Sequence, residues 1–140
     1  PDKQLEDEKL EFSRYLHNTL DGNFFNAGWA THYFNYVGIV DNNQFKSYYL
    51  DSVNLHSDIE WLRLYGESVE EIVRDGQNLG LNYLVIEDQQ YALSFLDDLY
   101  DNEKLYPYLT KIYDSNDVGM EKLNVKIFKI DYKEFFKYVD

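Results

Sequence analysis

The segment LNYLVIED, residues 81–88, decides the fold of this chain. Leu81–Ile86 is an almost unbroken apolar run that ends in the β-branched pair Val85 and Ile86. Such a run is typical of a central strand that is buried on both faces of a parallel sheet. Two carboxylates, Glu87 and Asp88, follow it directly. The segment therefore predicts a buried central strand with acidic side chains at its carboxyl end.

The residues before this strand predict a helix that leads into it. Ser68 and Glu71 have the spacing of a capping box, and an apolar stripe begins at Val69. Gly80 is expected to end the helix, because glycine readily adopts the left-handed backbone conformation found there. A helix, a glycine and a buried strand in this order make up half of a β-α-β unit.

The residues after the strand predict a helix and then a hairpin. Gln89–Tyr100 has helical spacing, and Asp88 is placed to cap it. Thr110–Asp114 and Asn124–Tyr132 predict two strands that pair antiparallel, since turn-forming residues separate them. The second of these strands carries two lysines and is expected near an edge of the sheet, because charged side chains protect edges.

The amino-terminal half predicts further elements of the same fold class. In chain order they are a helix at Glu6–Leu20, a strand at Asn23–Ala27, a helix at Trp29–Val37, a strand at Phe45–Val53 and a helical turn at Ile59–Leu62. Gly22 is expected to end the first helix in a left-handed conformation. Residues 1–140 are thus predicted to form a single α/β domain. Its sheet is expected to be mainly parallel and flanked by helices, with an antiparallel carboxyl-terminal hairpin at the edge.

Composition excludes several classes of function. A chain of 140 residues with 44% hydrophobic residues is large enough for one continuous core. A net charge of −13 argues against binding to nucleic acid or to an anionic membrane surface. The lack of cysteine excludes disulfides, a thiol nucleophile and cysteine-type zinc sites. The chain has no predicted signal or membrane-spanning segment. It begins at Pro1 rather than Met, so we expect it to be excised from a longer protein.

The predicted strand ends form the candidate ligand site. Glu87 and Asp88 follow the buried strand, while Asn26, Gly28 and Trp29 follow the first strand. In open α/β sheets, ligands bind outside the carboxyl ends of the strands, so these groups are expected to converge there. A carboxylate pair in that position can act as acid and base or bind a metal. A tight strand-to-helix turn and a helix cap account for the same residues without any ligand.

Other patterns that carry chemistry are weak. The glycine-rich motifs of nucleotide-binding proteins and the nucleophile motif GxSxG are absent. His17, His32 and His56 lack the spacing of metal ligands, and an oxygen-rich group at Asp51, His56 and Asp58 is non-specific. No metal, cofactor or catalytic residue is therefore predicted. Five aromatic residues suit either stacking on sugar rings or a place in the core: Trp29, Tyr33, Tyr36, Tyr48 and Tyr49.

Three motifs carry a resemblance to a known family: NYLVIED at residues 82–88, YPYLTKIYDS at 106–115 and VKIFKIDY at 125–132. In this order after a serine-capped helix, they resemble the soluble C-terminal domain of archaeal multi-spanning membrane glycosyltransferases. That group is similar to dolichyl-phosphate-mannose protein mannosyltransferases and the lipid A aminoarabinose transferase. The resemblance covers Leu81–Tyr132 well and the amino-terminal half in outline. It implies an extracytoplasmic α/β domain that follows a many-helix membrane portion holding the catalytic acidic residues, so no catalytic residue is carried over to this chain.

The resemblance leads us to expect a non-catalytic accessory domain of a membrane glycosyltransferase, acting outside the cytoplasm as a scaffold or in positioning the acceptor. Its expected partners are the membrane portion of its own parent chain and a glycan or polyprenyl-linked sugar, but not nucleic acid. The alternative is a stand-alone soluble α/β ligand-binding module or small enzyme with its site at the strand ends. A pure interaction domain is the third reading.

Overall fold

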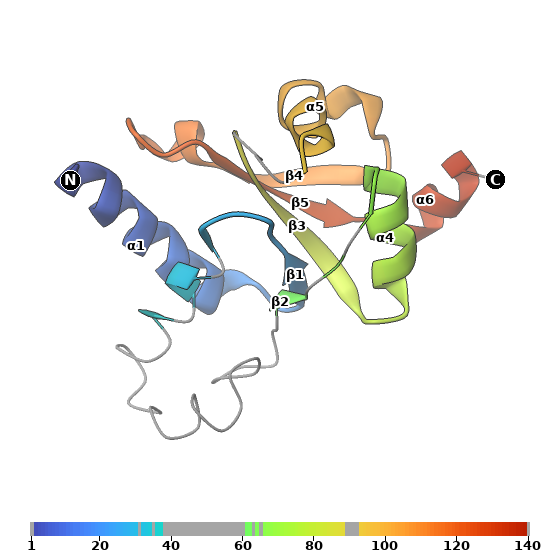
Figure 1. Ribbon diagram of the computed structural model, residues 1–140, viewed down its shortest axis with the longest axis horizontal. Helices are drawn as coiled ribbons and strands as arrows, with labels where there is room; N and C mark the ends of the chain where they lie inside the picture. Colours follow the sequence, from blue (N-terminus) through green and yellow to red (C-terminus); the bar gives the residue numbers. More distant parts are fainter. Residues whose placement is uncertain are drawn as a thin grey trace, which may run out of the picture.

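A five-stranded sheet forms the centre of the protein, with strand order β2-β1-β3-β5-β4 (Figure 1). This computed structural model describes residues 2–30, 32–34, 36–37, 61–62, 64, 66–88 and 93–139. The strands are β1 (Asn23–Phe25), β2 (Trp61–Leu62), β3 (Leu81–Glu87), β4 (Leu109–Asp114) and β5 (Val125–Ile130). The helices are α1 (Lys3–Thr19), α4 (Val69–Gln77), α5 (Phe95–Asp101) and α6 (Tyr132–Val139), with short 3-10 turns η1 (Glu103–Leu105) and η2 (Ser115–Val118).

The sheet is mixed. β1 pairs parallel with both β2 and β3, whereas β5 pairs antiparallel with both β3 and β4. The α/β class, the central position of β3 and the carboxyl-terminal hairpin at the edge of the sheet are confirmed. Within the hairpin β4 is the edge strand, whereas β5, expected near an edge because of its two lysines, is paired on both sides and lies next to the edge. The prediction of a mainly parallel sheet is wrong. An apolar run indicates that both faces of a strand are covered. It does not indicate whether the neighbouring strands run parallel or antiparallel to it.

The side chains of β3 alternate between two hydrophobic clusters. Leu84 and Ile86 belong to the cluster built with α4, α5 and α6. Tyr83 and Val85 belong to the cluster built with Phe12 and other residues of α1. The helices thus cover both faces of the sheet, and this arrangement explains why Leu81–Ile86 is apolar at every position except the exposed Asn82.

Local signals at the ends of α4 behave as predicted, with one difference. The Ser68 hydroxyl accepts a hydrogen bond from the N–H of Glu71 at 3.1 Å. The Glu71 carboxylate in turn accepts from the N–H of Glu67 rather than from that of Ser68. Gly80 has a φ of +79°, as expected after this helix.

Gly22, which was expected to end α1 in a left-handed conformation, does not adopt a positive φ. It instead lies against Asn82, whose Oδ1 would be 2.4 Å from an added Cβ.

Several other boundaries differ from the predictions. α1 begins at Lys3 because Asp2 caps it, accepting from the N–H of Leu5 at 3.1 Å. The predicted helical turn around residues 59–62 is wrong for residues 61–62, which form β2. Residues 30, 32–34 and 36–37 are helical as predicted, whereas the strand predicted at Phe45–Val53 lies outside the described residues. In the described part of the chain, no helix has the length and apolar character needed to cross a membrane.

Glu8 fastens α1 to the loop between β4 and β5. Its buried carboxylate accepts hydrogen bonds from the N–H groups of Leu123 (2.8 Å), Lys122 (2.9 Å) and Glu121 (3.1 Å). Burial by itself would raise the pKa of Glu8, but the hydrogen bonds outweigh it and lower the pKa below the ordinary 4.5. The sequence did not predict this role of Glu8, because its hydrogen-bond partners lie more than a hundred residues away along the chain.

Glu8→Gln is expected to lower the free energy of unfolding at neutral pH by about 1–3 kcal/mol, since the amide leaves backbone donors poorly paired. The contribution of the wild-type carboxylate is fully present above its unfolded-state pKa. It is lost as the pH falls through the lower pKa of the folded state, so the difference between the two proteins should shrink in acid. Urea titrations at several pH values measure this. Glu11→Gln, on an exposed position of the same helix, is the control. A difference that does not depend on pH would contradict the assignment.

Candidate strand-end site

Glu87, the last residue of β3, lies buried beside the end of β1. Its Oε2 accepts a hydrogen bond from Asn26 Nδ2 at 2.8 Å. The carboxylate also accepts from the backbone N–H groups of Trp29, at 3.3 Å, and Ala30, at 3.4 Å. Burial raises the pKa of Glu87, while the hydrogen bonds and the charge of Lys9 act in the opposite direction. The donors that hold this carboxylate come from the chain itself.

Asn26 and Gly28 shape the turn that surrounds this carboxylate. Asn26 Nδ2 also donates to the Val85 carbonyl at 2.9 Å, and its Oδ1 accepts from the Gly28 N–H at 3.0 Å. A Cβ on Gly28 would lie 2.0 Å from Glu87 Oε1, so only glycine leaves room for the carboxylate. The start of a helix is a common place for a bound phosphate. Here Glu87 supplies the anion internally.

Asp88 does not join this group. It is exposed, and its N–H donates to the carbonyl of Asn124 at 3.3 Å. The prediction that Asp88 caps the next helix is wrong, because α5 begins at Phe95 with Ser94 at its N-cap position. The structure therefore brings Asn26, Gly28, Trp29 and Glu87 together, and leaves Asp88 at the surface.

A hollow of about 310 Å³ lies on the flank of α1 close to Trp29. Its lining includes Glu6, His32, Tyr33 and Tyr36. Tyr33 donates its hydroxyl hydrogen to the Glu6 carboxylate, and this hydrogen bond together with burial raises the pKa of Tyr33 to about 12. The Tyr33 ring meets the Trp29 ring edge-on, with centroids 5.6 Å apart. Tyr36 is 50% exposed. Tyr48 and Tyr49, the other predicted stacking residues, lie outside the described part of the chain.

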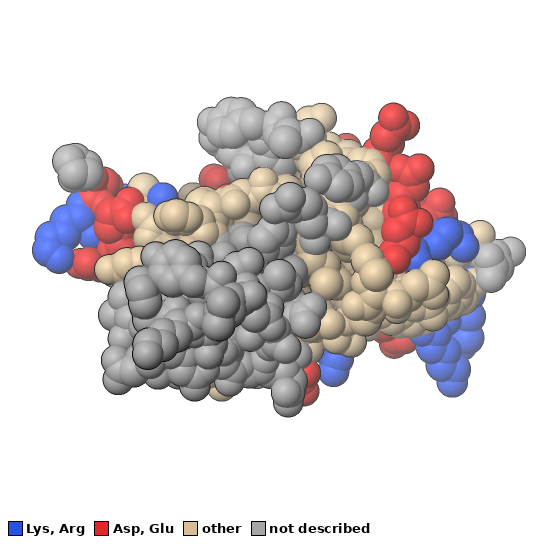
Figure 2. All heavy atoms as spheres, turned by 60° about the horizontal axis from the view of Figure 1, so that its bottom comes forward, with Lys and Arg blue, Asp and Glu red and all other residues tan. Residues whose placement is uncertain are grey.

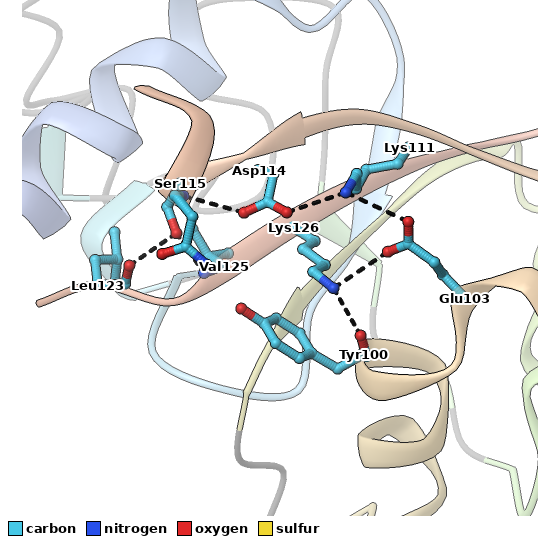
Figure 3. Close-up of polar contacts among 9 residues, drawn as sticks. Tyr100, Glu103, Lys111, Asp114, Ser115, Leu123, Val125 and Lys126 are labelled. Atoms are coloured by element: carbon cyan, nitrogen blue, oxygen red, sulfur yellow. Dashed lines mark hydrogen bonds and ion pairs between the residues drawn. The ribbon is translucent and has the colours of Figure 1, made fainter. Parts of the chain in front are cut away.

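An ion-pair network crosses the hairpin, and sequence reasoning missed it (Figure 3). Lys111 Nζ lies 3.0 Å from Asp114 Oδ2 and 3.3 Å from Glu103 Oε1. Lys126 Nζ lies 3.1 Å from Glu103 Oε2 and donates to the Tyr100 carbonyl at 2.7 Å. Burial would raise the pKa of Glu103, but hydrogen bonds from both lysines lower it. Lysines alternate with apolar residues along β4 and β5, and this pattern is visible in the sequence. Glu103 lies in the turn η1, and no pattern in the sequence indicates that it pairs with them.

Charge and metal-binding groups give no further site in the described residues. No three His, Cys, Asp or Glu side chains among them are placed to hold a metal ion. The group at Asp51, His56 and Asp58 lies outside those residues. On the face shown in Figure 2, acidic and basic side chains gather at the two ends of the molecule, and both signs occur at each end.

Comparisons with known protein families, with curated proteins and with solved structures find no match to this chain.

Proposed function

We propose that this protein is a non-catalytic accessory domain of a membrane glycosyltransferase, which acts outside the cytoplasm and positions a glycan-bearing acceptor beside the membrane portion of its own chain. The resemblance of Leu81–Tyr132 to the C-terminal domains of such enzymes supports the class. One structural observation carries the non-catalytic role: Glu87 is already bound by donors of the chain itself.

The strand-end site supports an accessory role because its chemistry is used for folding. A general acid, a general base or a nucleophile must reach a substrate atom. Glu87 is only 5% exposed, and its carboxylate contacts Asn26 and two backbone N–H groups. A substrate at this turn would have to displace these contacts, at a cost typical of leaving a buried charge unpaired. This observation disfavours the alternative of a small enzyme with its site at the strand ends.

The hollow beside Trp29 supports the glycan ligand. Sugar rings stack on exposed aromatic rings, and their hydroxyl groups donate to carboxylates. Tyr36 supplies the exposed ring, and the Glu6 carboxylate supplies an acceptor at the same hollow. Tyr33 is held in place by its own hydrogen bond to Glu6. A polyprenyl-linked sugar offers the same hydroxyl groups, and the acidic net charge leaves nucleic acid a poor partner.

The test is an NMR titration of the domain with mannose- and glucose-containing oligosaccharides. Weak binding with shifts of the Tyr33 and Tyr36 signals is expected. Tyr36→Ala should weaken that binding about three- to tenfold through loss of the stacking ring. Tyr138→Ala is the matched control, because this tyrosine is similarly exposed, at 59%, on α6.

Three results would contradict parts of the proposal. If Tyr36→Ala and Tyr138→Ala weaken sugar binding equally, the hollow beside Trp29 is not the sugar-binding site. No shift with any sugar would leave a scaffold role in place of acceptor positioning. Glycosyl transfer or hydrolysis by the purified domain, where none is expected, would overturn the non-catalytic assignment.

A further inference from the structure

A second and larger hollow, of about 420 Å³, lies between α1 and the end of β4. Its lining includes Glu11 and Tyr15 of α1, Ile112 and Tyr113 of β4, and residues of η2. In α1, residues 11 and 15 lie on the opposite flank from residues 6 and 10, which border the hollow beside Trp29. The groove between α1 and β4 is therefore separate from the proposed sugar site, and the inference below does not rest on the proposed function.

The apolar surface of this groove is unusually open. Ile112 is 40% exposed and Val118 is 58% exposed, and both line the groove. The rings of Tyr15 and Tyr113 pack against each other beside them, with centroids 4.5 Å apart. Exposed apolar side chains that share a concave surface with aromatic rings are typical of a surface that contacts another molecule.

The charges around the groove are acidic and partly unpaired. The charge of Lys111 is compensated by Asp114 and Glu103. Glu11 and Asp117 are both exposed and line the groove, and neither has an ion-pair partner among the residues that the structure describes. The groove thus combines apolar surface with two uncompensated negative charges, and this pattern favours a cationic occupant.

We propose that the groove between α1 and β4 docks a basic, partly apolar peptide segment of another protein. Its Lys or Arg side chains pair with Glu11 and Asp117, and its apolar side chains contact Ile112 and Val118. The strand register of β4 shifts between Lys111 and Tyr113, so the outer edge of the strand is irregular there. The segment therefore docks through its side chains rather than by adding a strand to the sheet.

The probe is a blocked hexapeptide of alternating Lys and Val, titrated into the domain and followed by NMR. Two peptides of the same length are controls: alternating Glu and Val removes the positive charge, and alternating Lys and Ser removes the apolar side chains. The Lys-Val peptide is expected to shift the signals of Tyr15, Ile112 and Val118. Its binding should weaken several-fold between about 50 mM and about 500 mM salt, because the pairs are exposed.

Charge-neutral variants of the protein separate the groove from the acidity of the whole chain. Glu11→Gln combined with Asp117→Asn should weaken the Lys-Val peptide about fivefold. Glu70→Gln combined with Asp75→Asn makes the same change in net charge on α4, which lies at the far end of the molecule from α1 (Figure 1), and should leave binding unchanged.

Equal weakening of Lys-Val binding by both pairs of substitutions, or binding of the Lys-Ser peptide as tight as that of the Lys-Val peptide, would overturn the proposal. So would groove shifts with oligosaccharides but not with the Lys-Val peptide. If oligosaccharides shift no signal at Tyr36 while the Lys-Val peptide still binds the groove, the acceptor-positioning role is contradicted and the peptide proposal stands.

Discussion

Gly28→Ala is expected to lower the free energy of unfolding by about 2–4 kcal/mol, since the new methyl group overlaps a buried carboxylate. The added Cβ would lie 2.0 Å from Glu87 Oε1 and 2.3 Å from Oε2. Either the turn shifts away from the sheet, or Glu87 leaves its hydrogen bonds to Asn26, Trp29 and Ala30. Urea denaturation of the two proteins measures the effect.

The same substitution in a Glu87→Ala background tests the cause. Glu87→Ala alone is expected to destabilise the protein, because two backbone N–H groups lose their acceptor and the Asn26 amide keeps only the Val85 carbonyl. Adding Gly28→Ala should then cost little, since the carboxylate that it would meet is gone. A loss from Gly28→Ala that is equally large in both backgrounds would mean that backbone conformation, and not the contact with Glu87, requires glycine at this position.

Ile86→Ala is expected to lower the free energy of unfolding by about 2–5 kcal/mol. Ile86 has 0% exposure and packs in the cluster formed by α4, α5 and α6. It stands on the central strand β3 and is paired there with Lys126 of β5. The surroundings can therefore collapse only partly into the space left by the truncated side chain.

Ser68→Ala provides the scale for that measurement. It removes only the cap of α4, a hydrogen bond of 3.1 Å to the N–H of Glu71, and should cost about 1 kcal/mol. Denaturant titrations that find equal, small losses for both variants would contradict the burial of β3 on two faces.

Much of the architecture was predictable because its causes are local. The apolar run of β3, the serine cap and glycine stop of α4, and the turn residues between β4 and β5 each act within a few residues. α6 was missed although its signal is local as well: Asp131 caps it by accepting from the N–H of Glu134 at 3.1 Å. The predicted strand Asn124–Tyr132 ran past the end of β5 at Ile130 and included both the cap residue and the first residue of α6.

The candidate site was predictable only as a location. Asn26, Gly28, Trp29 and Glu87 do meet, because the carboxyl ends of the adjacent parallel strands β1 and β3 lie at the same edge. What the carboxylate does there was not predictable. Its exposure, its donors and the fit of Gly28 against it depend on distances that span about sixty residues of chain.

The amino-acid pattern alone specifies the α/β class, a central strand buried on both faces and a carboxyl-terminal hairpin, because hydrophobic period and capping are properties of neighbouring residues. The mixed direction of the sheet and the role of each charged side chain arise from contacts between distant segments. Glu8 and Glu87 have the same side chain, yet one binds three N–H groups of a loop 113 to 115 residues away and the other closes a strand-to-helix turn. The energy of a carboxylate depends on burial and on the donors around it, and both are set by which distant segments the fold brings into contact.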